Sequence, residues 1–124
     1  MSRKVLGDKG EDIAAEYLCS LGWEILDRNW RCPSGELDIV AAEPSGGGTV
    51  VFCEVKTRRR LHGQLPVLPL EAVTERKVAK LRELALDWLR ATECHVKHLR
   101  IDAVGVIVGS DGLPTIQHRR GIGA

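Results

Sequence analysis

The segment V-F-C-E-V-K-T-R, from Val51 to Arg58, constrains the fold more than any other part of the chain. Its first six residues resemble the inside of a sheet, because β-branched and aromatic residues favour strands. Two opposite charges, Glu54 and Lys56, nevertheless lie within it two positions apart. Side chains alternate between the faces of a strand, so both charges are predicted to share one face with Phe52. The opposite face is predicted to carry Val51, Cys53 and Val55.

Hydrophobic periodicity divides the rest of the chain into helices and strands. Helices are predicted at 7–21 and 74–91, and strands at 23–30, 36–43, 49–57, 99–108 and, as a short fifth, 113–117. Asp8 and Thr74 are the predicted N-caps. Turn residues at 33–35 and 45–48 predict antiparallel hairpins between the first three strands. The stretch 58–70, with two prolines, is predicted as a loop, and Asp111-Gly112 as a turn.

The order α-β-β-β-α-β-(β) predicts an α/β fold with a mixed sheet. The sheet is expected to be antiparallel at its start, and the second helix is expected to act as a crossover that returns the chain parallel to an earlier strand. The 124 residues fit one domain, spanning 1–124, with a hydrophobic core of its own.

Composition excludes several classes of protein. No apolar run is long enough to cross a bilayer, and the basic N-terminus lacks the apolar core of a secretory signal, so a cytoplasmic protein without a membrane partner is expected. The cysteines contain no C-x-x-C pair and are predicted to be reduced thiols; they are Cys19, Cys32, Cys53 and Cys94. The net charge of +1 gives no general indication of a nucleic-acid partner, although basic residues cluster locally.

A second acidic residue, Asp38, is predicted near Glu54. On the strand 36–43, Glu36, Asp38 and Val40 are expected to share a face, with Leu37 and Ile39 on the other. If this strand pairs with 49–57, Asp38 can lie beside Glu54, and converging carboxylates of this kind are commonly neutralised by Mg²⁺. Lys56 would then stabilise charge on a phosphate or position a water molecule. The alternative is an ordinary surface ion pair between Glu54 and Lys56.

Two further carboxylates have competing interpretations. Glu11 borders the apolar stripe of the first helix, so it either leans toward the sheet or complements the helix dipole. Asp102 shares a strand face with Arg100, and a local ion pair between the two is the favoured prediction.

Several motifs occur in an order typical of one protein family. They are G-x-x-G-E at 7–11, N-W-R at 29–31, G-E-L-D-I-V at 35–40, V-F-C-E-V-K-T-R at 51–58, A-V-T-E-R-K at 72–77 and R-I-D-A-V at 100–104. The set resembles the YraN-type bacterial family of endonuclease-like proteins, which is similar to Holliday-junction resolvases within the PD-(D/E)XK nuclease superfamily. The resemblance runs from about residue 7 to residue 106, and it departs from the superfamily pattern at Leu37, where the superfamily's name has proline.

The resemblance implies a restriction-endonuclease-like fold, a mixed sheet flanked by helices, and a metal-dependent nuclease. Asp38, Glu54 and Lys56 would correspond to the catalytic signature, with Asp38 and Glu54 binding Mg²⁺ or Mn²⁺. Glu11 would match a further metal ligand, direct or through water. The implied substrate is DNA, including branched or junction DNA. Resolvase-like relatives pair on a junction, so a homodimer is an expectation of the resemblance alone.

Basic residues near this signature are the predicted nucleic-acid contacts. Arg58, Arg59 and Arg60 follow the charged strand directly, and Lys77 lies in the first turn of the second helix, where anions are favoured. Two other functions remain open from the residues: a catalytically silent nucleic-acid-binding module on the same fold, and a protein-interaction module that docks through the apolar stretch 65–70.

Overall fold

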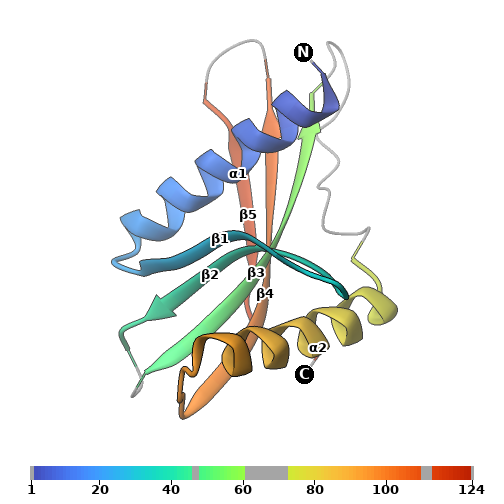
Figure 1. Ribbon diagram of the computed structural model, residues 1–124. Helices are drawn as coiled ribbons and strands as arrows, with labels where there is room; N and C mark the ends of the chain where they lie inside the picture. The colour runs from blue at the N-terminus through green and yellow to red at the C-terminus, as the bar shows by residue number, and fades with distance from the viewer. Residues whose placement is uncertain (1, 46–47, 61–72, 110–112, 124) are drawn as a thin grey trace.

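A five-stranded sheet lies between two helices, one on each face, in this computed structural model (Figure 1). The structure describes residues 2–45, 48–60, 73–109 and 113–123. The elements are α1 (Arg3–Ser20), β1 (Glu24–Cys32), β2 (Gly35–Glu43), β3 (Thr49–Arg59), α2 (Glu75–Thr92), β4 (His98–Val108) and β5 (Thr115–Arg119). The predicted α/β class and element order are confirmed, and the fifth strand is present.

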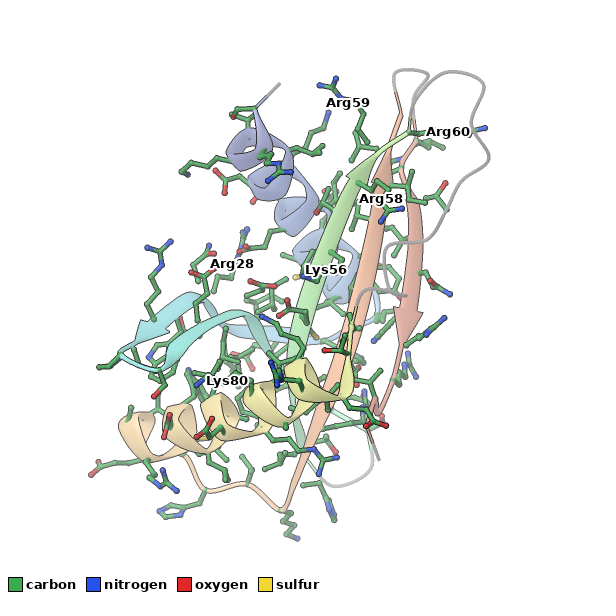
Figure 2. All side chains as sticks on the ribbon, turned by 90° about the vertical axis from the view of Figure 1, so that its right-hand side faces the viewer. Arg28, Lys56, Arg58, Arg59, Arg60 and Lys80 are labelled. Carbon is green, nitrogen blue, oxygen red and sulfur yellow. The ribbon has the colours of Figure 1, made fainter. Side chains whose placement is uncertain are left out.

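The strands lie in the sheet in chain order, β1-β2-β3-β4-β5. All neighbours are antiparallel except β3 and β4, which run parallel from Thr49↔His98 to Arg59↔Val108. A parallel pair needs a long crossover connection, which α2 supplies as the sequence predicted. The β1–β2 hairpin turns away from the long β3–β4 pair (Figures 1 and 2).

Each helix buries an apolar face against its side of the sheet. Ala14 and Leu18 of α1 are fully buried against one face, in a cluster that includes Trp23. On the other face the ring of Trp88 in α2 meets Phe52 edge-on, with ring centroids 5.7 Å apart, an arrangement that contributes about 1 kcal/mol beyond burial. Trp23 and Trp88 are therefore both buried in the core, one on each side of the sheet.

The helix starts differ in how well sequence predicted them. Helix α1 begins four residues early, because Ser2 Oγ accepts a hydrogen bond from Val5 N (3.1 Å) and caps it. Asp8 is therefore not a cap but lies inside the helix, paired with Lys4. Thr74 caps α2 as predicted. None of the described helices is long and apolar enough to span a membrane.

The end of β3 also differs from the prediction. The strand continues to Arg59, because β4 pairs with it over this whole length, so the predicted loop does not begin at Arg58. Most of that predicted loop, including 65–70, and the predicted turn at 111–112 lie outside the described residues.

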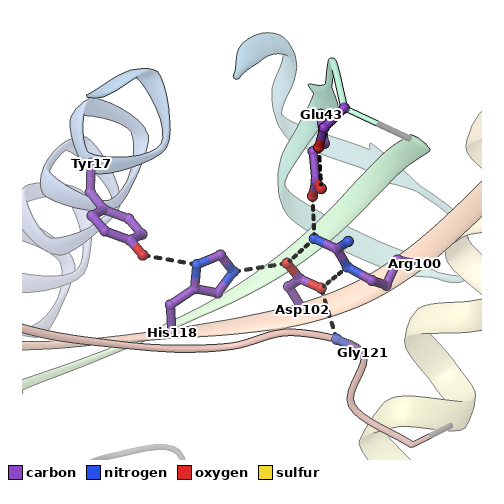
Figure 3. A network of polar contacts seen from close by, with 7 residues as sticks. Tyr17, Glu43, Arg100, Asp102, His118 and Gly121 are labelled. Atoms are coloured by element: carbon purple, nitrogen blue, oxygen red, sulfur yellow. Dashed lines mark hydrogen bonds and ion pairs between the residues drawn. The ribbon is translucent and has the colours of Figure 1, made fainter. Parts of the chain in front are cut away.

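A buried polar network ties β5 to the rest of the sheet (Figure 3). Asp102 is fully buried, accepts two hydrogen bonds from Arg100 (2.7 and 3.0 Å) and one from the Gly121 backbone N–H (3.0 Å), and lies 2.8 Å from His118 Nε2. His118 Nδ1 in turn lies 3.0 Å from the Tyr17 hydroxyl of α1. The predicted Arg100–Asp102 pair is confirmed, as part of a larger network than the sequence suggested.

We expect Asp102→Asn to lower the free energy of unfolding at pH 7 by about 3 kcal/mol, because Arg100 and His118 lose the negative charge with which they are paired. Burial would raise the pKa of Asp102, but hydrogen bonds from His118 and Arg100 hold it below its usual value of 3.8. The stabilisation is therefore present above about pH 4 and is lost in stronger acid. Chemical denaturation should show that the difference in free energy of unfolding between this variant and the wild type becomes smaller below about pH 4. Asp8→Asn, at an exposed pair, should change stability by less than about 0.5 kcal/mol at pH 7.

Helix α1 approaches β3 closely at Gly10. A Cβ atom built at Gly10 would overlap the side chain of Thr57, so only glycine allows this packing distance. Gly7, one turn earlier, is exposed and has no atom within 4 Å of the same virtual Cβ. The contact fixes α1 over the end of β3 that carries the charged residues.

We expect Gly10→Ala to lower the free energy of unfolding by about 2 kcal/mol through overpacking. Gly7→Ala, the matched control in the same helix, should raise it by about 0.5–1 kcal/mol, because alanine favours helix over glycine. Thermal or denaturant unfolding measures both. Equal effects of the two changes would show that α1 does not pack on β3 at this distance.

Candidate active site

The sheet forks next to the charged residues of β3. The β2–β3 ladder ends at Ile39↔Cys53, so Asp38 and Glu54 are the next residues on either strand. Beyond that point β2 stays paired with β1, and β3 stays paired with β4. The two acidic residues therefore lie where the strands separate, just beyond the last paired residues, whereas the sequence predicted them side by side on paired strands.

Asp38 bridges the fork. Its Oδ2 accepts a hydrogen bond from the backbone N–H of Val55, at 2.8 Å. The carboxylate thus takes the place of the strand carbonyl that would have continued the ladder. A backbone N–H inside a protein needs a partner, so this bond satisfies the donor and also fixes the direction of Asp38.

The strand faces change at the fork, which corrects one prediction. Asn29, which lies across from Asp38 on β1, has a φ of 52°, in the left-handed region. Leu37 packs with Val40 in the cluster under α2, whereas Ile39 packs in the cluster under α1. The predicted sharing of one face by Leu37 and Ile39 is therefore wrong. Val40, which was predicted to face away from Leu37, packs on the same side as Leu37, so the side-chain alternation along β2 is broken at Asp38.

Glu54 is buried and held by two lysines. Its side chain is 7% exposed, and its Oε1 lies 3.5 Å from Nζ of Lys56 and 3.5 Å from Nζ of Lys77. Lys56 comes from the same strand and Lys77 from the first turn of α2. The surface ion pair considered as an alternative does not describe this site, because the carboxylate is not on the surface. Lys77 was predicted as a phosphate contact, and the structure places its ammonium at this carboxylate.

Glu11 reaches the same region from α1. It is buried, and its Oε1 accepts hydrogen bonds from Asn29 Nδ2 (2.8 Å) and Arg28 Nε (3.2 Å). Because α1 begins at Arg3, Glu11 lies beyond the first turn, so the helix-dipole interpretation is wrong and the lean toward the sheet is confirmed. No role was predicted for Arg28 or Asn29, although Asn29 begins the family motif N-W-R.

The surroundings of Asp38 and Glu11 disfavour the charged forms of these two carboxyl groups. Burial, and next the charge of Glu54, raise the pKa of Asp38 from 3.8 to about 7, while the hydrogen bond from Val55 opposes the shift. Burial also raises the pKa of Glu11, against the effect of Arg28. Ionising a carboxyl group whose pKa is raised in this way costs free energy, and a cation bound next to it would lower that cost. The fork therefore has a site where positive charge would be stabilised.

The donor set fits a hard divalent cation. Within the described ranges, no three His, Cys, Asp or Glu side chains gather closely enough to enclose a metal ion by themselves. The fork provides two carboxylates, Asp38 and Glu54, and Mg²⁺ is usually held by one or two carboxylates with water and substrate phosphate oxygens completing the shell. Mn²⁺ accepts the same oxygen ligands.

A cavity of about 640 Å³ opens beside the fork on the α1 side. Its wall includes Asp38 and Glu11, and the exposed residues Arg58 and Arg59 line its rim. Arg60 follows at the end of the strand, also exposed but outside this wall. Figure 2 shows Lys56 nearer the middle of β3, with these arginines further along toward its end. Of the predicted nucleic-acid contacts, Arg58 and Arg59 thus form a basic rim next to the acidic fork, and Arg60 follows them in the chain.

We expect Asp38→Asn to raise the free energy of unfolding at pH 8 by about 2 kcal/mol in the absence of divalent cations. The folded pKa of about 7 lies above 3.8, so the wild type loses stability as pH rises through 7, and below about pH 4 the two proteins should match. A shift of this size corresponds to ~4 kcal/mol in a rigid site, and local relaxation is expected to halve it. Denaturant titrations from pH 4 to 8 with a chelator measure it.

Glu16→Gln, an exposed change on α1, is the control and should leave stability unchanged at every pH. If Asp38→Asn raises the free energy of unfolding equally at pH 4 and pH 8, the result would contradict a raised pKa for Asp38. The asparagine oxygen can still accept the hydrogen bond from Val55, so loss of that bond is not expected to mask the effect.

The comparisons with known proteins agree on one family. A family model described as "Uncharacterised protein family UPF0102" matches residues 10–106, a range that contains the whole fork. A UPF0102 protein of Mycolicibacterium smegmatis is 49% identical, covering 99% of this chain and 96% of its own. Similar proteins of Rhodococcus opacus (47% identical; 93% and 92% covered) and Beutenbergia cavernae (44%; 98% and 98%) carry the same family name.

Proposed function

The chain belongs to UPF0102, the YraN family, and we propose that it is a metal-dependent nuclease that hydrolyses phosphodiester bonds in DNA. The observation that supports this most is the fork: Asp38 and Glu54 follow the end of one ladder, with the Lys56 ammonium 3.5 Å from the Glu54 carboxylate. Two acidic groups and a lysine are the elements that metal-assisted phosphate chemistry requires.

Asp38 and Glu54 are the proposed ligands of Mg²⁺ or Mn²⁺. A bound cation of this kind polarises a phosphate oxygen and lowers the pKa of a coordinated water molecule. Lys56 positions the attacking water or stabilises the charge that develops on the phosphate. Glu11 acts from the α1 side, through water or by holding Arg28 and Asn29 in place beside Asp38.

The basic rim is the proposed DNA contact. Arg58, Arg59 and Arg60 would bind phosphates that flank the cleaved bond, which favours recognition of the backbone over base sequence. Lys77 would move between Glu54 and a substrate phosphate, because both are within reach of the first turn of α2. Branched or junction DNA is the proposed substrate, and two copies of the chain would be needed to cut both strands of a junction.

We expect the purified wild type to cleave flapped or branched DNA with Mn²⁺, and Asp38→Asn, Glu54→Gln and Lys56→Ala each to lose at least about 100-fold in rate. Glu16→Gln and Lys97→Ala, both exposed and away from the fork, are the matched controls and should retain activity. Light scattering on the free and DNA-bound protein reports the number of chains.

A second measurement does not depend on turnover. Mn²⁺ should raise the melting temperature of the wild type, because it neutralises the two carboxylates, and should raise that of Asp38→Asn much less. DNA binding without any cleavage would identify a catalytically silent binding module. Neither binding nor cleavage would instead support a protein-interaction role.

A further inference from the structure

A second cavity lies close to the fork, on the α2 face of the sheet. It has a volume of about 620 Å³, within the range of about 300–1,000 Å³ that small-molecule sites occupy. One side is formed by the start of α2, the floor by β4, and the remaining side by the end of β5 and the tail that follows it. None of its lining residues belongs to the wall of the cavity beside Asp38.

The floor of this cavity is one strand away from Glu54. In the β3–β4 register Glu54 lies beside Ala103, and in the β4–β5 register Ala103 lies beside Arg119. These three residues form one row across the sheet, with about 4.8 Å between neighbouring strands. In the next row, Gly105 lies between Lys56 and Gln117. The small residues of β4 thus leave space on the floor between the charged strand β3 and β5.

The tail that closes the cavity is firmly held. The Ile122 backbone N–H donates to the Ile101 carbonyl (2.9 Å), and an Arg82 guanidinium nitrogen donates to the Gly123 carbonyl (2.6 Å). Gly123 packs so closely on Val78 of α2 that a Cβ atom there would overlap it. These contacts give the cavity a wall of fixed shape.

The lining combines apolar surface with hydrogen-bonding groups of both kinds. Val78, Ala79 and Ile122 provide apolar contact. Among the polar lining residues, the Arg82 and Arg119 guanidinium groups are donors and the Glu75 carboxylate is an acceptor. An isolated phosphate could pair with the arginines, but it would also meet the negative charge of Glu75 and would leave the apolar surface of Val78, Ala79 and Ile122 without a partner. A nucleobase fits better, because it has flat apolar faces and an edge with both donors and acceptors.

We propose that this cavity receives one unpaired nucleotide next to the bond that is cut at the fork. The inference rests on the proposed nuclease function and makes it specific: the substrate is DNA with an unpaired nucleotide beside the cleavage position, as in a single strand, a flap or a branch. A base within a blunt duplex cannot enter, because it is stacked and paired.

The test is to fill the cavity from an exposed position. Ala79 lies on the exposed side of α2 and lines the cavity, so Ala79→Trp should fill it without disturbing the core. Ala91→Trp, exposed in the same helix but outside the cavity, is the matched control. Fluorescence anisotropy without divalent cations gives Kd for a flapped oligonucleotide and for a blunt duplex, and circular dichroism confirms the fold of each variant.

We expect the wild type and Ala91→Trp to bind the flapped DNA more tightly than the duplex. Ala79→Trp should weaken flap binding about tenfold, the size of a lost base contact, and leave duplex binding within about twofold. Arg119→Gln should shift binding in the same direction by a smaller factor. The proposal is overturned if Ala79→Trp behaves like Ala91→Trp, if it weakens both DNAs equally, or if the wild type shows no preference or binds neither DNA.

Cleavage with Mn²⁺, measured on the same variants, separates this inference from the function on which it rests. If the wild type cuts nothing but Ala79→Trp still loses the flap preference, the cavity assignment stands and the nuclease proposal falls. If the wild type cuts and Ala79→Trp keeps both its preference and its cleavage pattern, the nuclease proposal stands and the cavity assignment falls.

Discussion

The separation of β2 from β3 is the constraint on which the rest of the structure depends. Two strands that part inside a protein leave backbone groups without partners, and such groups are costly unless something else binds them. Here the Asp38 carboxylate accepts the hydrogen bond from Val55 N–H that a continuing ladder would have satisfied. The same arrangement brings a buried carboxyl group next to Glu54. The separation of the strands therefore explains both why Val55 N–H needs a side-chain acceptor and why two carboxyl groups lie close together.

The two helices act on this charge in opposite ways. Helix α2 supplies a positive charge, because it places Lys77 at Glu54. Helix α1 instead adds a carboxylate, Glu11, which raises the pKa of Asp38 and is itself paired with Arg28 of β1. The close contact of Gly10 with Thr57 sets how near α1 comes to the fork. The balance is incomplete at Asp38, as its raised pKa shows. A folded protein that keeps such a group at a stability cost commonly does so at a functional site.

Sequence reasoning predicted the features that depend on local pattern. The periodicity of 74–91 gave α2 with its cap, the length of the crossover gave the parallel pairing of β3 and β4, and spacing gave the Arg100–Asp102 pair. The proximity of Asp38 to Glu54 depends on the register of β2 against β3, and the predicted hairpin between these two strands allows that register.

The features that sequence missed depend on contacts between distant segments. The left-handed Asn29 and the change of faces around Asp38 lie on neighbouring strands, where β1 pairs with β2 at the fork. The partners of Glu11 and the approach of Lys77 to Glu54 likewise come from different elements. The capping of α1 by Ser2 was a local signal, and an available serine before a charged segment could have revealed it.

The parallel pairing of β3 with β4 has a consequence for how the chain acquires its fork. These strands are separated in sequence by the whole of α2, and contacts between such distant segments form slowly, after local hairpins. The β1–β2–β3 meander can form early, but β3 beyond Cys53 has no partner until β4 arrives. The fork is therefore assembled among the last parts of the molecule, so a nascent or partly unfolded chain does not yet bring Asp38 and Glu54 together.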